Sequence, residues 1–269
     1  MRHACRRLLG MLLSKLRLHR VAFAANDGID VVHKRRKVWA TWVISPGNLF
    51  LKLTGSSIVV LPSSRWIAWE LAVDAARQRN LVSTAGGNAI GLSCRRIPGQ
   101  SLAQILAHHH VGHEQKSAAL RWSLLALNEL HRHVADWGDG IVQSISHGDA
   151  TANNVIVNLD NGTACWIDFD TRHHPSLTEA DRRTDDLRAL IYSAAVHWPA
   201  TRYLDLAEIL IESQPECSTL RHLHARLQNE WCRMTTAQLA QAPLQWSQAS
   251  ALRDALLQAL GQPHDASGL

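Results

Sequence analysis

The sequence predicts an α+β fold in which a small antiparallel sheet with one helix precedes a mainly helical part. Three observations lead to this prediction. Short runs of β-branched and alternating residues fill much of the chain before Pro98. Stretches with helical periodicity dominate the chain after Pro98 and are interrupted by one hairpin. The composition, 46% apolar and 19% charged over 269 residues, is that of a folded globular protein.

The first part is expected to hold five strands and one helix. The expected strands are residues 29–33, 38–45, 49–54, 81–84 and 89–96. Pro46-Gly47-Asn48 predicts a turn, and alternation places Leu49, Leu51 and Leu53 on one face of the third strand. Pro62 with the serines after it predicts the start of the helix, which reaches about residue 79.

The second part is expected to be helical from Ser101 onwards, apart from short β segments. Its longest periodic stretch covers residues 114–137 and has one apolar side, formed by Leu120, Leu124, Leu127, Leu130 and Val134. A β segment is expected at 141–146, and two strands at 155–158 and 164–168 flank the turn 159–162. From about residue 184 the chain reads as helical to its end.

Residues 1–24 are expected to form a basic amphipathic helix, ahead of parts at 25–97 and 98–269. Its leucines share one face and are surrounded by Lys and Arg, a pattern typical of helices that lie on anionic membranes. A helix that docks on the protein itself is the alternative. Ala22-Phe23-Ala24 has the form of a secretory cleavage site, but Lys15 and Arg17 interrupt the apolar run that a signal peptide needs.

The net charge and the cysteines bear on the kind of partner and on the cellular compartment of the protein. The net charge of +5 suits a partner that carries phosphate, whether a nucleotide, a nucleic acid or an anionic membrane. Five scattered cysteines without a CxxC pattern favour a reducing compartment. The histidines at 108–110 match no metal-binding spacing and are interpreted as a polar loop. We therefore expect a cytoplasmic protein, either free or peripheral at the inner face of the membrane.

The segment His147-Gly148-Asp149-Ala150-Thr151-Ala152-Asn153-Asn154, followed by Ile167-Asp168-Phe169-Asp170, carries the chemistry. Phosphoryl transfer needs a carboxylate that orients the attacking hydroxyl, oxygen ligands for Mg²⁺, and cations that meet the phosphate charge. Asp149 and Asn154 lie in a short loop that leads into a strand, and Asp168 ends the next strand. The hairpin should fold Asp168 back beside Asn154, so that both can bind one hard cation.

This segment resembles the HGDxxxxN…IDFD motifs of protein-kinase-like phosphotransferases, among them the aminoglycoside and choline kinases and the lipopolysaccharide core kinases. The resemblance implies a bilobal kinase-like fold, with a small β-sheet lobe and a helical lobe, that uses ATP and Mg²⁺. It implies that Asp149 is the catalytic base or hydroxyl-orienting group. Asn154 and Asp168 would be the magnesium ligands, and His147 would brace the loop.

The resemblance extends upstream, with less specific motifs. Lys52 matches the lysine that contacts the nucleotide phosphates, and Glu70 matches its ion-pair partner. The stretch 94–102 resembles the hinge between the lobes, which implies that the backbone of Arg96 and Ile97 binds adenine. Downstream, Asp185-Asp186-Leu187 resembles the start of the helix that supports the catalytic loop.

Two departures from the family pattern bear on function. No GxGxxG motif is present, and the expected turn between the first two strands is His33-Lys34-Arg35-Arg36-Lys37. We interpret it as a solvated turn, the alternative being that its cations replace the glycine-rich loop. The short stretch between Asp168 and Asp186 favours a small-molecule, sugar or lipid-sugar acceptor over a protein.

The leading expectation is a kinase of a sugar hydroxyl, such as a lipopolysaccharide core sugar. No nucleic-acid partner is expected, and residues 1–20 could contact a membrane. An aminoglycoside or other small-molecule kinase, a Ser/Thr protein kinase, and a pseudokinase that acts as a binding module are the alternatives.

Overall fold

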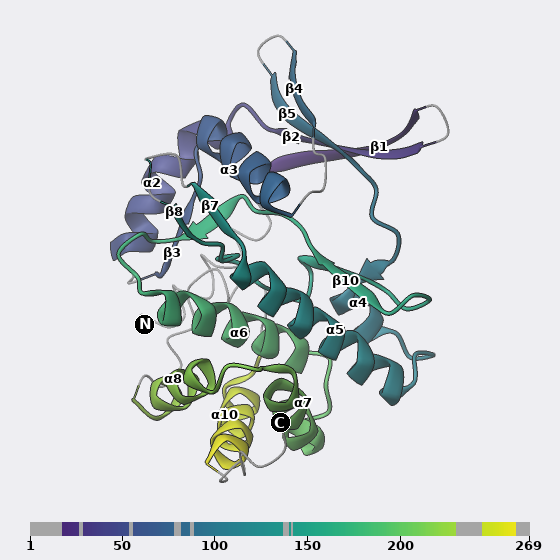
Figure 1. The fold of residues 1–269 in the computed structure, drawn as a ribbon, viewed down its shortest axis with the longest axis vertical. Helices are drawn as coiled ribbons and strands as arrows, with labels where there is room; N and C mark the ends of the chain where they lie inside the picture. Colours follow the sequence, from purple (N-terminus) through teal and green to yellow (C-terminus); the bar gives the residue numbers. More distant parts are fainter. Residues whose placement is uncertain are drawn as a thin grey trace.

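The computed structural model describes residues 18–26, 29–53, 56–77, 82–86, 89–136, 140, 142–229 and 244–261. Within these ranges the protein combines small antiparallel sheets with helices, as the sequence predicts. Figure 1 shows the largest sheet at one end of the molecule and a group of helices at the other. None of the helices in the described ranges is both long and apolar enough to cross a membrane.

The largest sheet has four antiparallel strands in the order β1-β2-β5-β4. Their bounds are β1 (His19–Asn26), β2 (Ile29–Arg36), β4 (Val82–Gly86) and β5 (Ala89–Arg95). In the register of β2 and β5, Val32 lies opposite Cys94 and Lys34 lies opposite Leu92. Because side chains alternate between the two faces of a sheet, these four residues share one face.

Two expectations for the N-terminal region are wrong where the structure describes it. Residues 19–24 belong to β1 instead of a helix, while residues 1–17 lie outside the described residues. The segment 33–37 is not a turn, because β2 continues to Arg36. Its basic residues alternate in exposure as a strand requires: His33 and Arg35 are exposed, whereas Lys34 is half-buried and Arg36 is buried.

Helix α2 (Ala40–Leu53) occupies the segment in which strands at 38–45 and 49–54 and a turn at 46–48 were expected. Those expectations are wrong. Ala40, Ile44 and Leu51 form the buried side of the helix at helical spacing, while Leu49 and Leu53 are exposed. The alternation of leucines in the sequence therefore does not reflect a strand.

The side chain of Asn48 attaches α2 to the neighbouring strand β3 (Ile58–Val60). The side-chain Nδ2 of Asn48 donates to the backbone carbonyl of Val60 at 2.8 Å, and the side-chain Oδ1 of Asn48 accepts the backbone N–H of Val60 at 2.8 Å. β3 pairs in turn with β11 (Thr171–His173), a strand that the sequence did not predict. The predicted helix after Pro62 is confirmed as α3 (Ser63–Ala76), which buries Trp66 and Glu70.

The predicted hairpin is also confirmed. It consists of β9 (Val155–Asn158) and β10 (Thr163–Trp166), and β6 (Gln100–Ser101) adds a third strand beside β9. Backbone pairing places Trp166 opposite Val155 at the end of the hairpin. The residues that follow β10 therefore emerge beside the residues that precede β9, as predicted for Asp168 and Asn154.

The remaining described elements are mostly helical. They are α4 (Leu102–Ala107), α5 (His113–Arg132), β7 (Val134–Asp136), β8 (Val142–Ser144), α6 (Glu179–Ala195), the short 3-10 helix η1 (Ala200–Arg202), α7 (Tyr203–Ser213), α8 (Cys217–Asn229) and α10 (Trp246–Leu260). Helix α5 ends earlier than expected, so Val134 lies in β7 and is 58% exposed. Helix α6 begins before residue 184, where the helical part was expected to resume.

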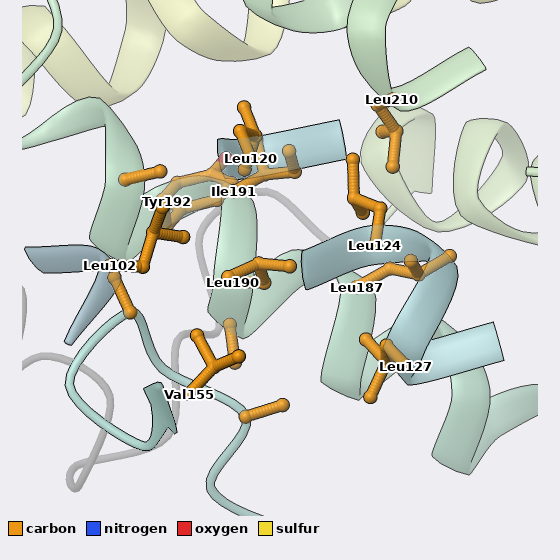
Figure 2. Packing of buried hydrophobic residues seen from close by; sticks show 14 of the residues in the cluster. Leu102, Leu120, Leu124, Leu127, Val155, Leu187, Leu190, Ile191, Tyr192 and Leu210 are labelled. Atoms are coloured by element: carbon orange, nitrogen blue, oxygen red, sulfur yellow. The ribbon is translucent and has the colours of Figure 1, made fainter. Parts of the chain in front are cut away.

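Helix α5 packs against the hairpin and against α6, and their apolar side chains form the centre of the core. Figure 2 shows Leu124 and Leu127 of α5 on either side of Leu187 of α6, and Leu190 of α6 above Val155 of β9. The apolar side of α5 predicted from Leu120, Leu124, Leu127 and Leu130 is buried as expected. This core fixes the ends of β9 and β10, where the candidate site lies.

Candidate functional site

Asp186 of α6 anchors the loop 147–154, which leads into β9. One carboxylate oxygen accepts the backbone N–H of His147 at 2.8 Å, and the other accepts that of Gly148 at 2.9 Å. The imidazole of His131 lies 2.9 Å from the same carboxylate. Burial alone would raise the pKa of Asp186. The charge of His173 and the hydrogen bond from His131 outweigh burial and lower that pKa. A charged, buried carboxylate therefore holds the start of the loop.

Gly148 allows the loop to pass close to the strand β11. Its φ of +78° lies in the left-handed region. A Cβ atom on Gly148 would lie 2.9 Å from the backbone of Arg172, closer than a real contact permits. The glycine therefore serves both the conformation and the packing of the loop.

Asp149 and Asn154 are bonded to each other across the loop. The side-chain amide nitrogen of Asn154 donates to the backbone carbonyl of Asp149 at 2.9 Å and to its carboxylate at 3.0 Å. This use of the nitrogen turns the amide oxygen of Asn154 away from Asp149. The backbone carbonyl of Asn154 accepts the N–H of Ile167 at 2.9 Å, which brings Asp168 next to it. The three residues predicted to act together therefore lie side by side.

Asp168 has the backbone conformation of a strained residue. Its φ is +69°, and it is the only non-glycine residue with positive φ in the described part of the chain. Such a conformation costs roughly 1–2 kcal/mol for an L-residue and persists only where its surroundings enforce it. One constraint is the hydrogen bond of 2.8 Å between the His147 ring and the carbonyl of Ile167. His147 thus connects loop 147–154 to the segment that carries Asp168.

Lys34 of β2 brings a cation to this group. Its ammonium forms an ion pair with Asp168 and lies 3.2 Å from the carboxylate of Glu70 in α3. It also lies 5.0 Å from the centre of the Trp66 ring. Burial would raise the pKa of Asp168, but the charge and hydrogen bond of Lys34 outweigh it and lower that pKa. Asp168 is therefore held as a carboxylate.

Glu70 is fixed from several directions. The same oxygen that faces Lys34 accepts the indole N–H of Trp66 at 3.1 Å and the backbone N–H of Phe169 at 3.1 Å. Because Phe169 follows Asp168 directly, α3 is joined to the segment that carries Asp168. The predicted pairing of Glu70 with Lys52 is wrong. Lys52 lies in the last turn of α2 with an exposed side chain, and the lysine that pairs with Glu70 is Lys34.

A second acidic residue, Asp170, lies beside Asp168. Burial, followed by the charge of Asp168, raises the pKa of Asp170 to about 8. His19 of β1 lies 3.5 Å from its carboxylate, and the ligand atoms of His19, Asp168 and Asp170 all lie within 4.8 Å of one another. This is the one group with metal-binding spacing in the part of the chain that the structure describes. Crowded carboxylates of this kind are stabilised by a bound cation.

His19 is better suited to orient Asp170 than to bind a metal. Burial, with the charge of Lys34 second, lowers the pKa of His19 to about 3, so its ring is neutral. The Nε of Arg36 donates to Nε2 of His19 at 3.1 Å. The proton of the neutral ring is then on Nδ1, which faces Asp170. The oxygens of Asp168 and Asp170 remain as cation ligands.

A cavity of about 420 Å³ lies between the four-stranded sheet and the hairpin. Its walls are apolar on both sides, with Val21, Val32 and Leu92 from the sheet and Ile156, Trp166 and Ile167 from the hairpin region. Lys34, Glu70 and Asp168 form part of its lining, as do Arg96 and Ile97 of the predicted hinge. Asp149 and Asn154 are not part of this lining and adjoin it through Ile167 and Asp168.

The structure thus brings together Glu70, Asp149, Asn154 and Asp168 and places Arg96 and Ile97 on the adjoining cavity. Sequence reasoning missed Lys34, His19 and Asp170. The β-rich start of this strand, residues 29–33, was recognised, but the run of basic residues after it was interpreted as a turn, and Lys34 was therefore not placed on the strand. The histidines at 108–110 form an exposed turn, and of these residues none is part of the group with metal-binding spacing.

Replacing Asp186 by Asn is expected to destabilise the protein by about 3 kcal/mol. The change removes a buried charge that accepts two backbone N–H groups and turns an NH₂ group towards one of them. Urea unfolding measures the effect, with Asp160→Asn as the control because Asp160 is an exposed turn residue. Equal midpoints for the two variants would contradict the anchoring role.

A comparison of the sequence with models of known protein families gives no match, and a comparison with curated proteins gives none either.

Proposed function

We propose that this chain is an ATP- and Mg²⁺-dependent phosphotransferase with a bilobal protein-kinase-like fold, which transfers the γ-phosphate of ATP to a hydroxyl group. The observation that carries the proposal is the convergence of Lys34, Glu70 and Asp168 in the wall of the cavity, with Asp149 and Asn154 beside them. Phosphoryl transfer depends on positioning and on charge stabilisation, and these residues supply both.

The cavity is proposed to hold the nucleotide. Its volume of about 420 Å³ falls in the range of sites for small molecules, and its apolar walls suit a flat base. The backbone around Arg96 and Ile97 would supply hydrogen bonds to the base. Lys34 would then meet the phosphates, because Glu70 and Asp168 hold its ammonium at the cavity wall.

Asp149 is proposed to receive the acceptor. Its carboxylate is fixed by Asn154 and belongs to a loop that Asp186 anchors. A carboxylate in this position can orient the attacking hydroxyl and accept its proton as the bond to phosphorus forms. The position of the Asp149 carboxylate is set by the hydrogen bonds that hold loop 147–154 to Asp186 and by the bond from Asn154.

The residues present fit a magnesium ion. Asn154 has its amide oxygen turned away from Asp149, and Asp168 is a carboxylate at neutral pH. Mg²⁺ prefers oxygen ligands of this kind, and the neighbouring Asp170 adds a further carboxyl group. Asn154 and Asp168 would therefore hold the ion, which when bound supplies positive charge against the phosphate oxygens.

A sugar hydroxyl, such as that of a lipopolysaccharide core sugar, is the acceptor that we propose. Between Asp168 and the start of α6 at Glu179 the chain forms only the short strand β11 and its flanking turns. So short a segment offers little surface on which a protein substrate could be positioned. A compact hydroxyl compound needs only to reach Asp149.

Replacing Asp168 by Asn tests the proposal. Binding of a non-hydrolysable ATP analogue, measured by calorimetry, should strengthen with Mg²⁺ in the parent protein. The factor by which Mg²⁺ raises the affinity should be at least about tenfold smaller in Asp168→Asn, because a carboxylate ligand is lost. Metal-free binding should change much less. Asp160→Asn, which alters an exposed carboxylate in the hairpin turn, should behave like the parent.

Two results would speak against the proposal. A parent protein that binds the analogue equally with and without Mg²⁺ would exclude a metal-dependent nucleotide site. Equal losses with and without Mg²⁺ in Asp168→Asn would remove Asp168 from the metal site.

A further inference from the structure

Helix α2 presents a stripe of apolar side chains to the outside of the molecule. The α2 stripe consists of Trp39, which directly precedes the helix, and of Trp42, Pro46, Leu49 and Leu53 within it, spaced alternately three and four residues apart. Trp42 is 80% exposed and Leu53 is 78% exposed. At 3.6 residues per turn this spacing forms one side of the helix, opposite the buried Ala40, Ile44 and Leu51.

A helix on the surface of a globular protein normally buries one apolar face and exposes a polar one. Helix α2 is apolar on both faces, and Val38, which precedes it, is also 76% exposed. Figure 1 shows α2 at the edge of the molecule, beside α3. A contiguous exposed apolar surface of this kind marks a contact site.

The charged residues near the stripe in the sequence have one sign. Residues 31–69, which include α2, contain six Lys or Arg and no Asp or Glu. Residues 1–69 as a whole contain twelve Lys or Arg and two Asp or Glu, whereas residues 70–269 contain sixteen and twenty-one. The positive charge of the protein is therefore concentrated in the part of the sequence that carries the stripe. Lys37 and Lys52 flank the stripe at its two ends.

Charge argues against two other occupants, and Pro46 argues against a third. A second copy in a two-fold dimer would bring two positive surfaces together. The segment 1–17, which precedes β1 in the sequence, carries five Lys or Arg and no acid, so it is positive as well. A partner helix in a coiled coil would meet Pro46 in the middle of the seam.

We propose that the α2 stripe docks on the surface of an anionic lipid bilayer. Trp is enriched where a protein meets the membrane interface, and apolar side chains of a surface helix bury at the boundary between headgroups and acyl chains. Lys37 and Lys52 then lie near the headgroups, where each basic residue adds attraction that salt screens. This inference concerns a different face from the cavity and does not depend on the proposed function.

Vesicle flotation with the full chain tests the inference, using vesicles of phosphatidylglycerol and phosphatidylcholine and vesicles of phosphatidylcholine alone. The parent should float with the anionic vesicles, and the floated fraction should fall at high salt. The double variant Trp42→Ser/Leu49→Ser should weaken this binding at least tenfold, and Lys52→Gln should weaken it about fivefold. Since both apolar side chains are exposed, the melting temperature should not fall.

The matched control is Leu125→Ser/Leu204→Ser, which removes two exposed leucines from α5 and α7 and should bind vesicles like the parent. Equal binding by the α2 double variant and the parent would overturn the inference, as would a parent that ignores anionic vesicles. Binding of the parent to polyglutamate without binding to vesicles would assign the stripe to an acidic protein instead. A parent dimer that the double variant splits, seen by sedimentation, would assign it to a second copy.

Discussion

Replacing Asp149 by Asn is expected to lower the turnover of phosphoryl transfer by at least about 10²-fold, since a positioned acid–base group contributes that much or more. The variant should keep the fold, because Asn has the shape of Asp and can still accept the hydrogen bond from Asn154. It should also keep nucleotide binding, because Asp149 does not line the cavity. Single-turnover transfer and calorimetry measure the two quantities separately.

Asn153→Ala serves as the control for the loop. Asn153 lies in the same loop, and its side chain is exposed, so turnover in this variant should remain close to that of the parent. If Asp149→Asn transfers phosphate at the parent's rate, Asp149 is not the group that orients the hydroxyl.

The positions of Asp149, Asn154 and Asp168 could be predicted because the information for them is local. A loop that enters a strand, a hairpin turn and a second strand determine the positions of Asp149, Asn154 and Asp168 within about twenty residues of sequence. Backbone pairing of β9 and β10 then fixes the geometry, and the hydrogen bond between Ile167 and Asn154 completes it. The helix that carries Glu70 was also predicted correctly, because Pro62 marks the start of α3, but the predicted partner of Glu70 was wrong.

The segment between β2 and β3 could not be predicted in the same way, because its signals conflict. Pro46 and Gly47 favour a turn and alternating leucines favour a strand, yet burial of Ala40, Ile44 and Leu51 and the bonds of Asn48 to Val60 select a helix. These are tertiary contacts, which a local pattern does not contain. Because α2 was mistaken for a strand, the lysine that pairs with Glu70 was expected at Lys52, whereas it is Lys34 of β2.

Arg36 shows the same limit for buried polar residues. Nothing in the local sequence distinguishes Arg36, which is 6% exposed, from the exposed Arg35 next to it. The distinction comes from the Trp66 ring, which lies 4.9 Å from the Arg36 guanidinium. The packing of α3 beneath the sheet therefore decides which basic residues enter the site.

The structure pairs Lys34 with Glu70, whereas the sequence pattern predicted Lys52 for this role, so the two lysines can be compared directly. Lys34→Met is expected to lower turnover by about 10²- to 10³-fold, the loss typical when one preorganised group that stabilises the charge of the transition state is removed. Lys52→Met should leave turnover within about twofold of the parent, because Lys52 lies in the last turn of α2 and is exposed. Both variants lose one lysine from a strongly basic region, so a general charge effect would affect them equally.

Lys34→Met leaves Glu70 and Asp168 without their cation, so the variant needs a check for folding. Lys34→Arg provides one, since it keeps the positive charge and the stability that depends on it. Its planar guanidinium cannot reproduce the position of the ammonium between the two carboxylates, and turnover should still fall by at least about tenfold. A folded Lys34→Arg variant with parental turnover would contradict the need for an ammonium at this position. A loss in Lys52→Met as large as that in Lys34→Met would return the phosphate-binding role to Lys52.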